Sequence, residues 1–252
     1  MPRHLPPATL VPSTPQRRRH APARRSDYHD YRECVRSDFG FTCAWCLVSE
    51  PDLREAESAA VRRWSMQIDH VLPRESHAER EADYSNLVLA CSNCNRTKSS
   101  YDPSRGGGAA LLDPTDIAWG DHFDARDGDL VARTEAAREV AQRVGVNHDL
   151  KRALRRARAA KVGALLRRVE VGRLESRTHR VTLLRLLDEP GRTAAEREAL
   201  AAALTGLDGA LAPLLDALAR WALPPPGTPE CLCDERACSL PSWLDEQMLT
   251  TT

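Results

Sequence analysis

Two cysteine pairs constrain the fold of this chain more than any other feature. Cys43 and Cys46 form one pair, Cys91 and Cys94 form the other, and two residues separate the members of each. This gap lets both thiolates of a tight turn reach one tetrahedral Zn²⁺ at about 2.3 Å, so two pairs complete a four-sulfur shell. A closed shell leaves no position for a substrate. The sequence therefore predicts a structural zinc that fixes the fold and takes no part in a reaction.

The chain between the two pairs predicts a small sheet followed by a helix. A short run, 66–71, has the length of a strand and stops before Pro73, and a second run, 84–90, leads into the second pair. Ser92 or Asn93 is suited to cap a helix that follows at once. The order strand, strand, helix predicts a ββα unit, and this insertion explains why the pairs lie further apart than in a simple zinc ribbon.

Polar residues of this unit have the chemistry that phosphodiester hydrolysis requires, which is a base for water and a cation beside the phosphoryl oxygens. His70 suits the base because an imidazole titrates near neutral pH. Asp69 precedes it, and Asn95 stands in the first turn of the predicted helix. Their oxygens suit a hard cation such as Mg²⁺. For Asn86, two readings stand equally: it orients the His70 ring, or it caps the second strand.

The sequence around these residues resembles the HNH endonuclease family. The similar strings are 68–73, 84–91 and 94–99. His70 stands at the family's first His, Asn86 at its middle Asn, and Asn95 at a last position that is His in many members. The resemblance implies a ββα-metal fold that cuts nucleic acid. Because Asn95 supplies an oxygen, Mg²⁺ or Mn²⁺ is favoured over a catalytic Zn²⁺. Lys98 resembles the family's helix lysine, which implies contact with the substrate phosphate.

Charge is balanced over the whole chain but not along it. The formal net charge is zero, so overall charge predicts no partner. Residues 1–26 carry six arginines and no acid, and residues 151–185 carry twelve Lys or Arg against two Glu. These stretches suit a phosphate backbone, or else they are a disordered tail and the solvated face of a helix. We expect a nucleic-acid partner, with DNA favoured over RNA.

Two observations concern the compartment. Residues 1–26 lack the apolar stretch of a secretion signal, and no run reaches the ~18 apolar residues of a membrane span. We therefore expect a cytoplasmic protein without a membrane segment. In a reducing compartment the eight cysteines are expected to be metal ligands or thiols, and Cys231, Cys233 and Cys238 are expected to be free.

The expected fold class is α+β, with four regions along the chain. They are a disordered Pro/Arg-rich tail at 1–26, an HNH nuclease domain with an extension at 27–133, an α-helical region at 134–223, and an irregular Cys-containing tail at 224–252. The stretch 113–134 resembles an extension of bacterial HNH proteins found beside defence ATPases. That resemblance implies a role in genome defence with a partner protein.

An alternative of a different class is a zinc-stapled module that binds nucleic acid or protein through the basic helix and does not cleave. A histidine at a strand end is, taken alone, more often a hydrogen-bonded structural residue. The presence of Asp69, His70 and Asn95 together favours an enzyme, because a binding module has no need of a base beside two oxygen ligands.

Overall fold

The structure is a computed structural model that describes residues 11–12, 15–16, 22–56, 58–102, 105 and 110–214. The region 224–252, with its three cysteines, lies outside the described residues, as does most of 1–26. The chain divides between Ala159 and Ala160 into two compact units. The four predicted region boundaries stay predictions.

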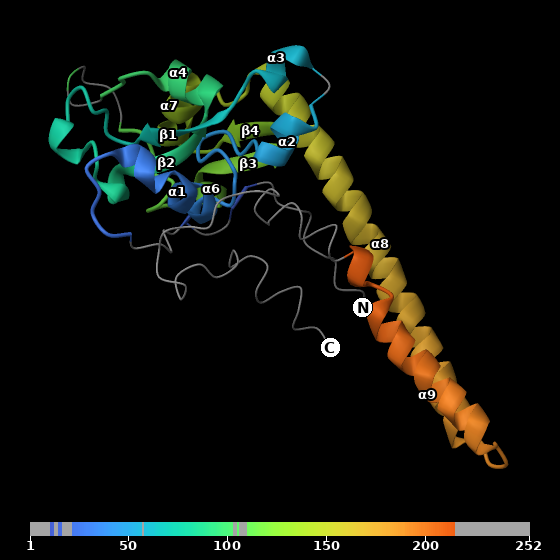
Figure 1. Cartoon of the computed structure of the whole chain (residues 1–252). Coiled ribbons are helices and arrows are strands. Elements are labelled where there is room, and N and C mark those ends of the chain that lie inside the picture. The colour runs from blue at the N-terminus through green and yellow to red at the C-terminus, as the bar shows by residue number, and fades with distance from the viewer. Residues whose placement is uncertain are drawn as a thin grey trace. The chain divides into compact units, whose positions relative to one another are not determined.

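The first unit contains the predicted ββα elements (Figure 1). Its N-terminal part holds η1 (Tyr28–Tyr31), α1 (Arg32–Asp38), α2 (Glu50–Arg54) and α3 (Ala59–Arg62). The central part holds β1 (Met66–His70), η2 (Ala78–Arg80), η3 (Tyr84–Asn86), β2 (Leu87–Cys91) and α4 (Ser92–Lys98). Next come α6 (Trp119–His122), β3 (Phe123–Arg126), β4 (Asp129–Ala132), α7 (Glu135–Val144) and the start of α8 (Asp149–Asp188).

The two strands of the ββα unit pair antiparallel, with Met66 opposite Cys91 and His70 opposite Leu87. Every residue of β2 is buried, and α4 contacts both strands. The α+β class and the ββα order are confirmed. Two details differ from the prediction. Residues 84–86 form a 3-10 turn, and the cap of α4 is Cys91, whose sulfur accepts the Cys94 amide at 3.4 Å.

The extension after the ββα unit is a second antiparallel hairpin, β3 and β4, which the sequence did not predict. Trp119 attaches it to the core, because this side chain is 2% exposed and its indole N–H donates to the Ala44 carbonyl at 2.7 Å. A buried tryptophan removes about 150–250 Å² from water, so this contact holds the hairpin firmly. Ala44 lies within the first cysteine pair, and the extension therefore packs directly on the metal-binding turn.

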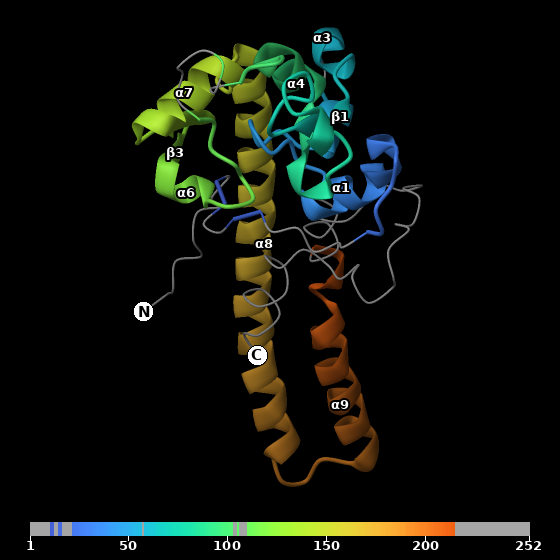
Figure 2. The same cartoon turned by 90° about the vertical axis from the view of Figure 1, so that its left-hand side faces the viewer.

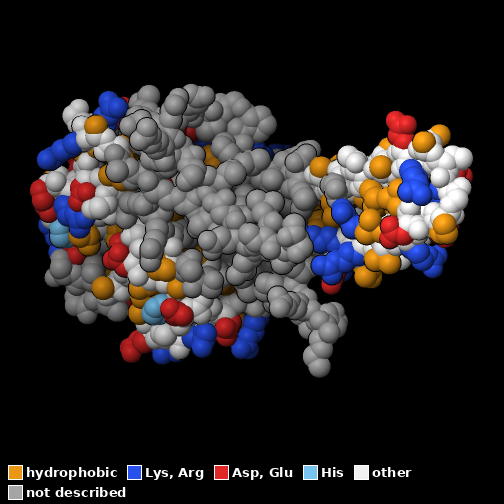
Figure 3. All heavy atoms as spheres, turned by 90° about the horizontal axis from the view of Figure 1, so that it is seen from below, with side chains coloured by type: hydrophobic (Ala, Val, Ile, Leu, Met, Phe, Trp, Pro, Cys, Tyr) orange, Lys and Arg blue, Asp and Glu red, His pale blue; other side chains and the backbone are white. Residues whose placement is uncertain are grey.

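The second unit is a helical hairpin made of residues 160–188 of α8 and of α9 (Ala194–Gly209), which run side by side (Figure 2). Thr193 and Glu196 form a capping box at the start of α9. The predicted helical region and its break near Pro190 are confirmed. Hydrophobic and basic side chains interleave on the described surface of this hairpin (Figure 3). None of the described helices combines the length and apolar character that crossing a membrane requires.

The β3–β4 turn gives a test of packing between the extension and α8. Gly128 has φ +81°, and a Cβ built there would lie 2.5 Å from the Arg152 carbonyl oxygen. Gly40 has φ +53° but nothing within 4 Å. An alanine at either position must adopt the left-handed backbone conformation, which costs about 1–2 kcal/mol. Gly128→Ala also pushes α8 away, so its free energy of unfolding should fall by about 1–3 kcal/mol more than that of Gly40→Ala in urea. Equal losses would contradict this packing.

Candidate metal centre and active site

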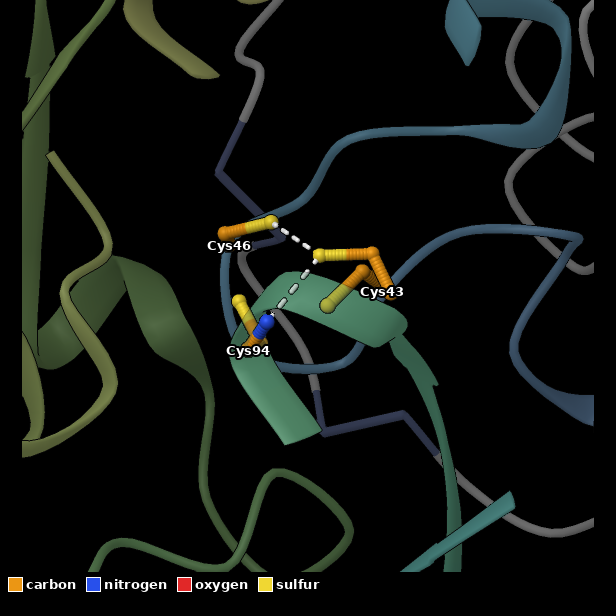
Figure 4. Close-up of side chains that lie close together, drawn as sticks. Cys43, Cys46 and Cys94 are labelled. Atoms are coloured by element: carbon orange, nitrogen blue, oxygen red, sulfur yellow. Dashed lines mark hydrogen bonds between the residues drawn. The ribbon is translucent and has the colours of Figure 1, made fainter. Parts of the chain in front are cut away.

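The four predicted cysteines meet in the core of the first unit, and Figure 4 shows Cys43, Cys46 and Cys94 close together. All four are fully buried, and their sulfurs lie within 4.8 Å of one another. The sulfurs of Cys46 and Cys91 are 3.8 Å apart. Four sulfurs held at about 2.3 Å from one tetrahedral zinc would be separated by about 3.8 Å. The predicted cluster is confirmed, and its geometry fits a structural zinc.

The protonation of these thiols also fits a cation at their centre. Burial raises the pKa of the Cys43 and Cys94 thiols well above the ordinary value. Burial opposes ionisation of Cys46 as well, but hydrogen bonds from the neighbouring cysteines bring the pKa of Cys46 well below its ordinary value. One thiol of the set thus ionises at the expense of the others. A divalent cation removes this conflict, because it stabilises all four thiolates at once.

A buried lysine and arginine from α8 face this centre. Lys151 is fully buried, and its ammonium donates to the Cys94 sulfur at 3.0 Å and to the Gly145 carbonyl at 2.9 Å. Arg155, one turn on and equally buried, donates to the Cys46 carbonyl at 2.8 Å. A third cation, Arg158, forms an ion pair with Asp52 at 3.0 Å. Lys151 and Arg155 are therefore not among the residues of 151–185 that could contact a phosphate backbone, and contact by the rest of this stretch stays a prediction.

The spacing of these cations carried a signal that the sequence reading missed. Positions 151, 155 and 158 fall on one helical face, together with the core residue Leu154. Cations on an inward face require buried acceptors, and a shell of four thiolates around Zn²⁺ carries two net negative charges. Although burial disfavours the ammonium, the charge of the cysteine sulfurs raises the pKa of Lys151. Lys151 is thus a counter-ion of the metal centre.

A separate pocket of about 200 Å³ lies at the far end of β1. It is lined by Tyr28, Ile68, Asp69, His70, Pro73, Arg74, Glu75, Asn95, Lys98, Ser99 and Ser100. The structure thus brings together four of the predicted site residues, Asp69, His70, Asn95 and Lys98. Asn86 does not line the pocket. Tyr28, Arg74 and Glu75 were not predicted, and no motif in the sequence marks them.

The imidazole of His70 is held by the loop that joins β1 to β2. Its Nε2 lies 2.9 Å from the carbonyl oxygen of Glu81. A carbonyl oxygen only accepts, so Nε2 carries a proton, and in the neutral ring Nδ1 is then the nitrogen with the lone pair. His70 is 8% exposed and lines the pocket. A neutral ring with an available Nδ1 is the form in which a histidine accepts a proton from water.

Asn86 fixes the same loop. Its amide donates to the carbonyls of Leu72 at 3.0 Å and Arg80 at 3.3 Å, and its oxygen accepts the Leu72 amide at 2.8 Å. The side chain is 1% exposed, so these bonds are shielded from water. The two bonds to Leu72 join the ends of the loop that presents the Glu81 carbonyl to His70, and the third holds Arg80 inside that loop. Asn86 therefore contacts the backbone of the loop, and its predicted role in orienting the His70 ring stays a prediction.

Asp69 and Lys98 form a buried ion pair with 3.2 Å between Oδ1 and Nζ. The Asp69 carboxylate also accepts the His70 amide and the Trp45 indole, both at 2.8 Å. A carboxylate has about four acceptor positions, and three are used here, so one remains for a cation. The Lys98 side chain is 1% exposed. Its predicted contact with a phosphate stays a prediction.

Asn95 contributes the second oxygen donor of the pocket. Its amide nitrogen donates to the side-chain oxygen of Gln67 at 3.0 Å. This bond uses the nitrogen and leaves the amide oxygen for another partner. An amide oxygen beside a carboxylate suits Mg²⁺ or Mn²⁺, which prefer oxygen ligands and keep several waters. The roles predicted for Asp69 and Asn95 as ligands stay predictions.

Residues 59–100 match the family described as HNH endonuclease, which is about a sixth of the chain. The matched segment contains β1, β2 and α4, and with them all the predicted polar site residues. The resemblance is confirmed over this segment, and it supports a nuclease that binds nucleic acid and uses a divalent metal. No curated protein and no solved structure matches the chain significantly.

Replacing the counter-ion of the metal centre tests its electrostatic role. Lys151→Met keeps most of the volume and removes the charge beside the Cys94 sulfur. Because partners of metal ligands affect affinity about 10–100-fold, zinc affinity should fall by that factor in competition with a chelating dye. Arg152→Met is the matched control, since Arg152 is the next residue and pairs with Asp129 and Asp149. Equal zinc affinities of the two variants would contradict the role of Lys151.

Proposed function

We propose that this protein is a metal-dependent endonuclease that hydrolyses phosphodiester bonds in nucleic acid, with DNA favoured over RNA. The observation that carries the proposal is the pocket at the end of β1, which His70, Asp69 and Asn95 line together, with the Nε2 of His70 already bonded to the Glu81 carbonyl. A base next to two oxygen donors is the arrangement that this reaction needs.

In this proposal each residue has one task. His70 removes the proton from the attacking water, and Asn86 holds the loop that orients its ring. Asp69 and Asn95 hold Mg²⁺ or Mn²⁺, which when bound neutralises charge on the phosphoryl oxygens. Lys98 adds a positive charge beside Asp69 and attracts the scissile phosphate. The structural zinc stays in its closed shell and keeps the ββα unit folded.

One observation favours the alternative of a binding module that does not cleave. The Asp69–Lys98 ion pair already neutralises the carboxylate, so Asp69 has less need of a cation. The pocket itself argues against this alternative, because a module that only binds has no need of a histidine base beside the oxygens of Asp69 and Asn95. Nicking of a supercoiled plasmid with Mg²⁺, with Mn²⁺ and with EDTA separates the two functions.

The second unit is the proposed binding surface for the phosphate backbone. Its exposed basic residues on α8 are Lys161, Arg167, Arg168, Arg177, Arg180 and Arg185. Only two acids, Glu170 and Glu175, lie in the same stretch. This surface replaces the larger one predicted from the sequence. A role in genome defence with a partner protein, inferred from the resemblance of 113–134, belongs to the same proposal.

Substitutions in the pocket distinguish the base from the metal ligands. His70→Ala should lower the nicking rate by about 10²–10⁴-fold, because it removes the group that accepts the proton. Asn95→Ala should also lose activity, but through weaker binding of the catalytic ion. Raising Mg²⁺ or Mn²⁺ should therefore restore part of the activity of Asn95→Ala and none of that of His70→Ala.

The control for this experiment is zinc content, which should match the wild type in both variants because neither side chain supplies a sulfur to the cysteine cluster. Nicking by His70→Ala at the wild-type rate would show that the assigned base is wrong.

Salt dependence tests the binding surface on the second unit. If five of its charges contact phosphates, the slope of log affinity against log salt on duplex DNA should be about −4.5. Replacing Arg167, Arg168 and Arg177 together with alanine leaves two such contacts, so the slope should become shallower, at about −1.8. The control replaces Arg126 and Arg133, which pair with Asp124 in the first unit. A slope that the triple variant leaves unchanged would assign the arginines to a solvated helix face.

A further inference from the structure

Tyr28 lies well before the matched segment, yet it forms part of the pocket wall. Its ring meets the imidazole of His70 edge to face, with 4.8 Å between centroids and 73° between planes. We propose that Tyr28 is a positioning residue that sets the plane of the His70 ring. This inference rests on the proposed function, in which His70 is the base.

The segment around Tyr28 has a local cap on one side and a ring buried in the core on the other. Asp27 caps η1 by accepting the His29 amide at 2.8 Å. At the other end Tyr31 is 2% exposed, and its ring contacts that of Tyr84 with 5.2 Å between centroids. These anchors fix the backbone that carries Tyr28. The ring of Tyr28 therefore has a defined place when it meets His70.

A second contact is needed because a single hydrogen bond does not fix an imidazole. The hydrogen bond from Nε2 to the Glu81 carbonyl holds one ring atom, but χ2, the torsion angle that rotates the ring, has a broad range of allowed values in histidine. Rotation about the Cβ–Cγ bond would change the direction in which Nδ1 points. The Tyr28 ring packs against the imidazole and closes off this rotation. The orientation of the His70 ring is thus set jointly by the loop between β1 and β2, which lies within residues 59–100, and by Tyr28, which lies outside them.

Kinetics of three variants test this role. Tyr28→Ala should lower kcat for plasmid nicking by about 10–100-fold with KM unchanged, because displacing a reacting group by about 1 Å costs about 10²-fold. Tyr28→Phe keeps the ring and should retain the wild-type kcat. Asp30→Asn, an exposed residue on the same turn, is the matched control and should not change the rate.

A double substitution shows whether Tyr28 acts through His70. In the His70→Ala background, Tyr28→Ala should add no further loss, because no imidazole remains to be positioned. Losses that multiply, or a rise in KM alone, would mean that Tyr28 contacts the substrate directly, and would overturn the proposal.

Nuclear magnetic resonance of the ¹⁵N-labelled imidazole gives a readout that does not need cleavage. The wild type and Tyr28→Phe should show the single Nε2–H tautomer of His70, and Tyr28→Ala should show a mixture. An unchanged tautomer in Tyr28→Ala would overturn the role of Tyr28 even if cleavage is normal. Failure of the wild type to nick DNA would instead reject the proposed function, and the spectra would still decide about Tyr28.

Discussion

Four buried cysteine sulfurs lie within 4.8 Å of one another, and a divalent cation between them would stabilise all four as thiolates. The first unit packs around this cluster. The cysteines come from one turn before the ββα unit, the end of β2 and the start of α4, so one zinc would tie that turn to the ββα unit. Binding free energies of structural zinc sites are on the order of 10 kcal/mol, comparable with the net stability of a whole domain. Lys151 and Arg155 attach the first turns of α8, which belong to the first unit, to the same centre.

The two strands of the sheet separate the cysteine cluster from the pocket that contains His70. Cys91 pairs with Met66 at one end of the two strands, and Leu87 pairs with His70 at the other. Four residues of strand span about 13 Å, so the pocket lies well clear of the sulfur shell. Helix α4 then brings Asn95 and Lys98 back toward the His70 end. A closed metal site and an open pocket thus share two strands without sharing ligands.

The parts that the sequence predicted are those set by short spacings. The cysteine pairs, the two strands, the helix after Cys94 and the grouping of Asp69, His70 and Asn95 depend on residues near one another or on a family pattern. The unpredicted parts depend on contacts between distant residues. Lys151 reaches Cys94 across 57 positions, and Arg155 reaches Cys46 across 109. From the surplus of positive charge, both residues were expected on the surface, because a count of charges does not show which face of a helix packs inward.

The most direct test of a structural metal beside a catalytic pocket is plasmid nicking by the wild-type protein, with zinc content determined on the same sample. Protein treated with EDTA should keep one zinc in the buried thiolate shell and lose its nicking activity, and Mg²⁺ in excess of the chelator should restore it. Nicking that persists in EDTA, or that returns only when zinc is added, would contradict the separation of the two sites.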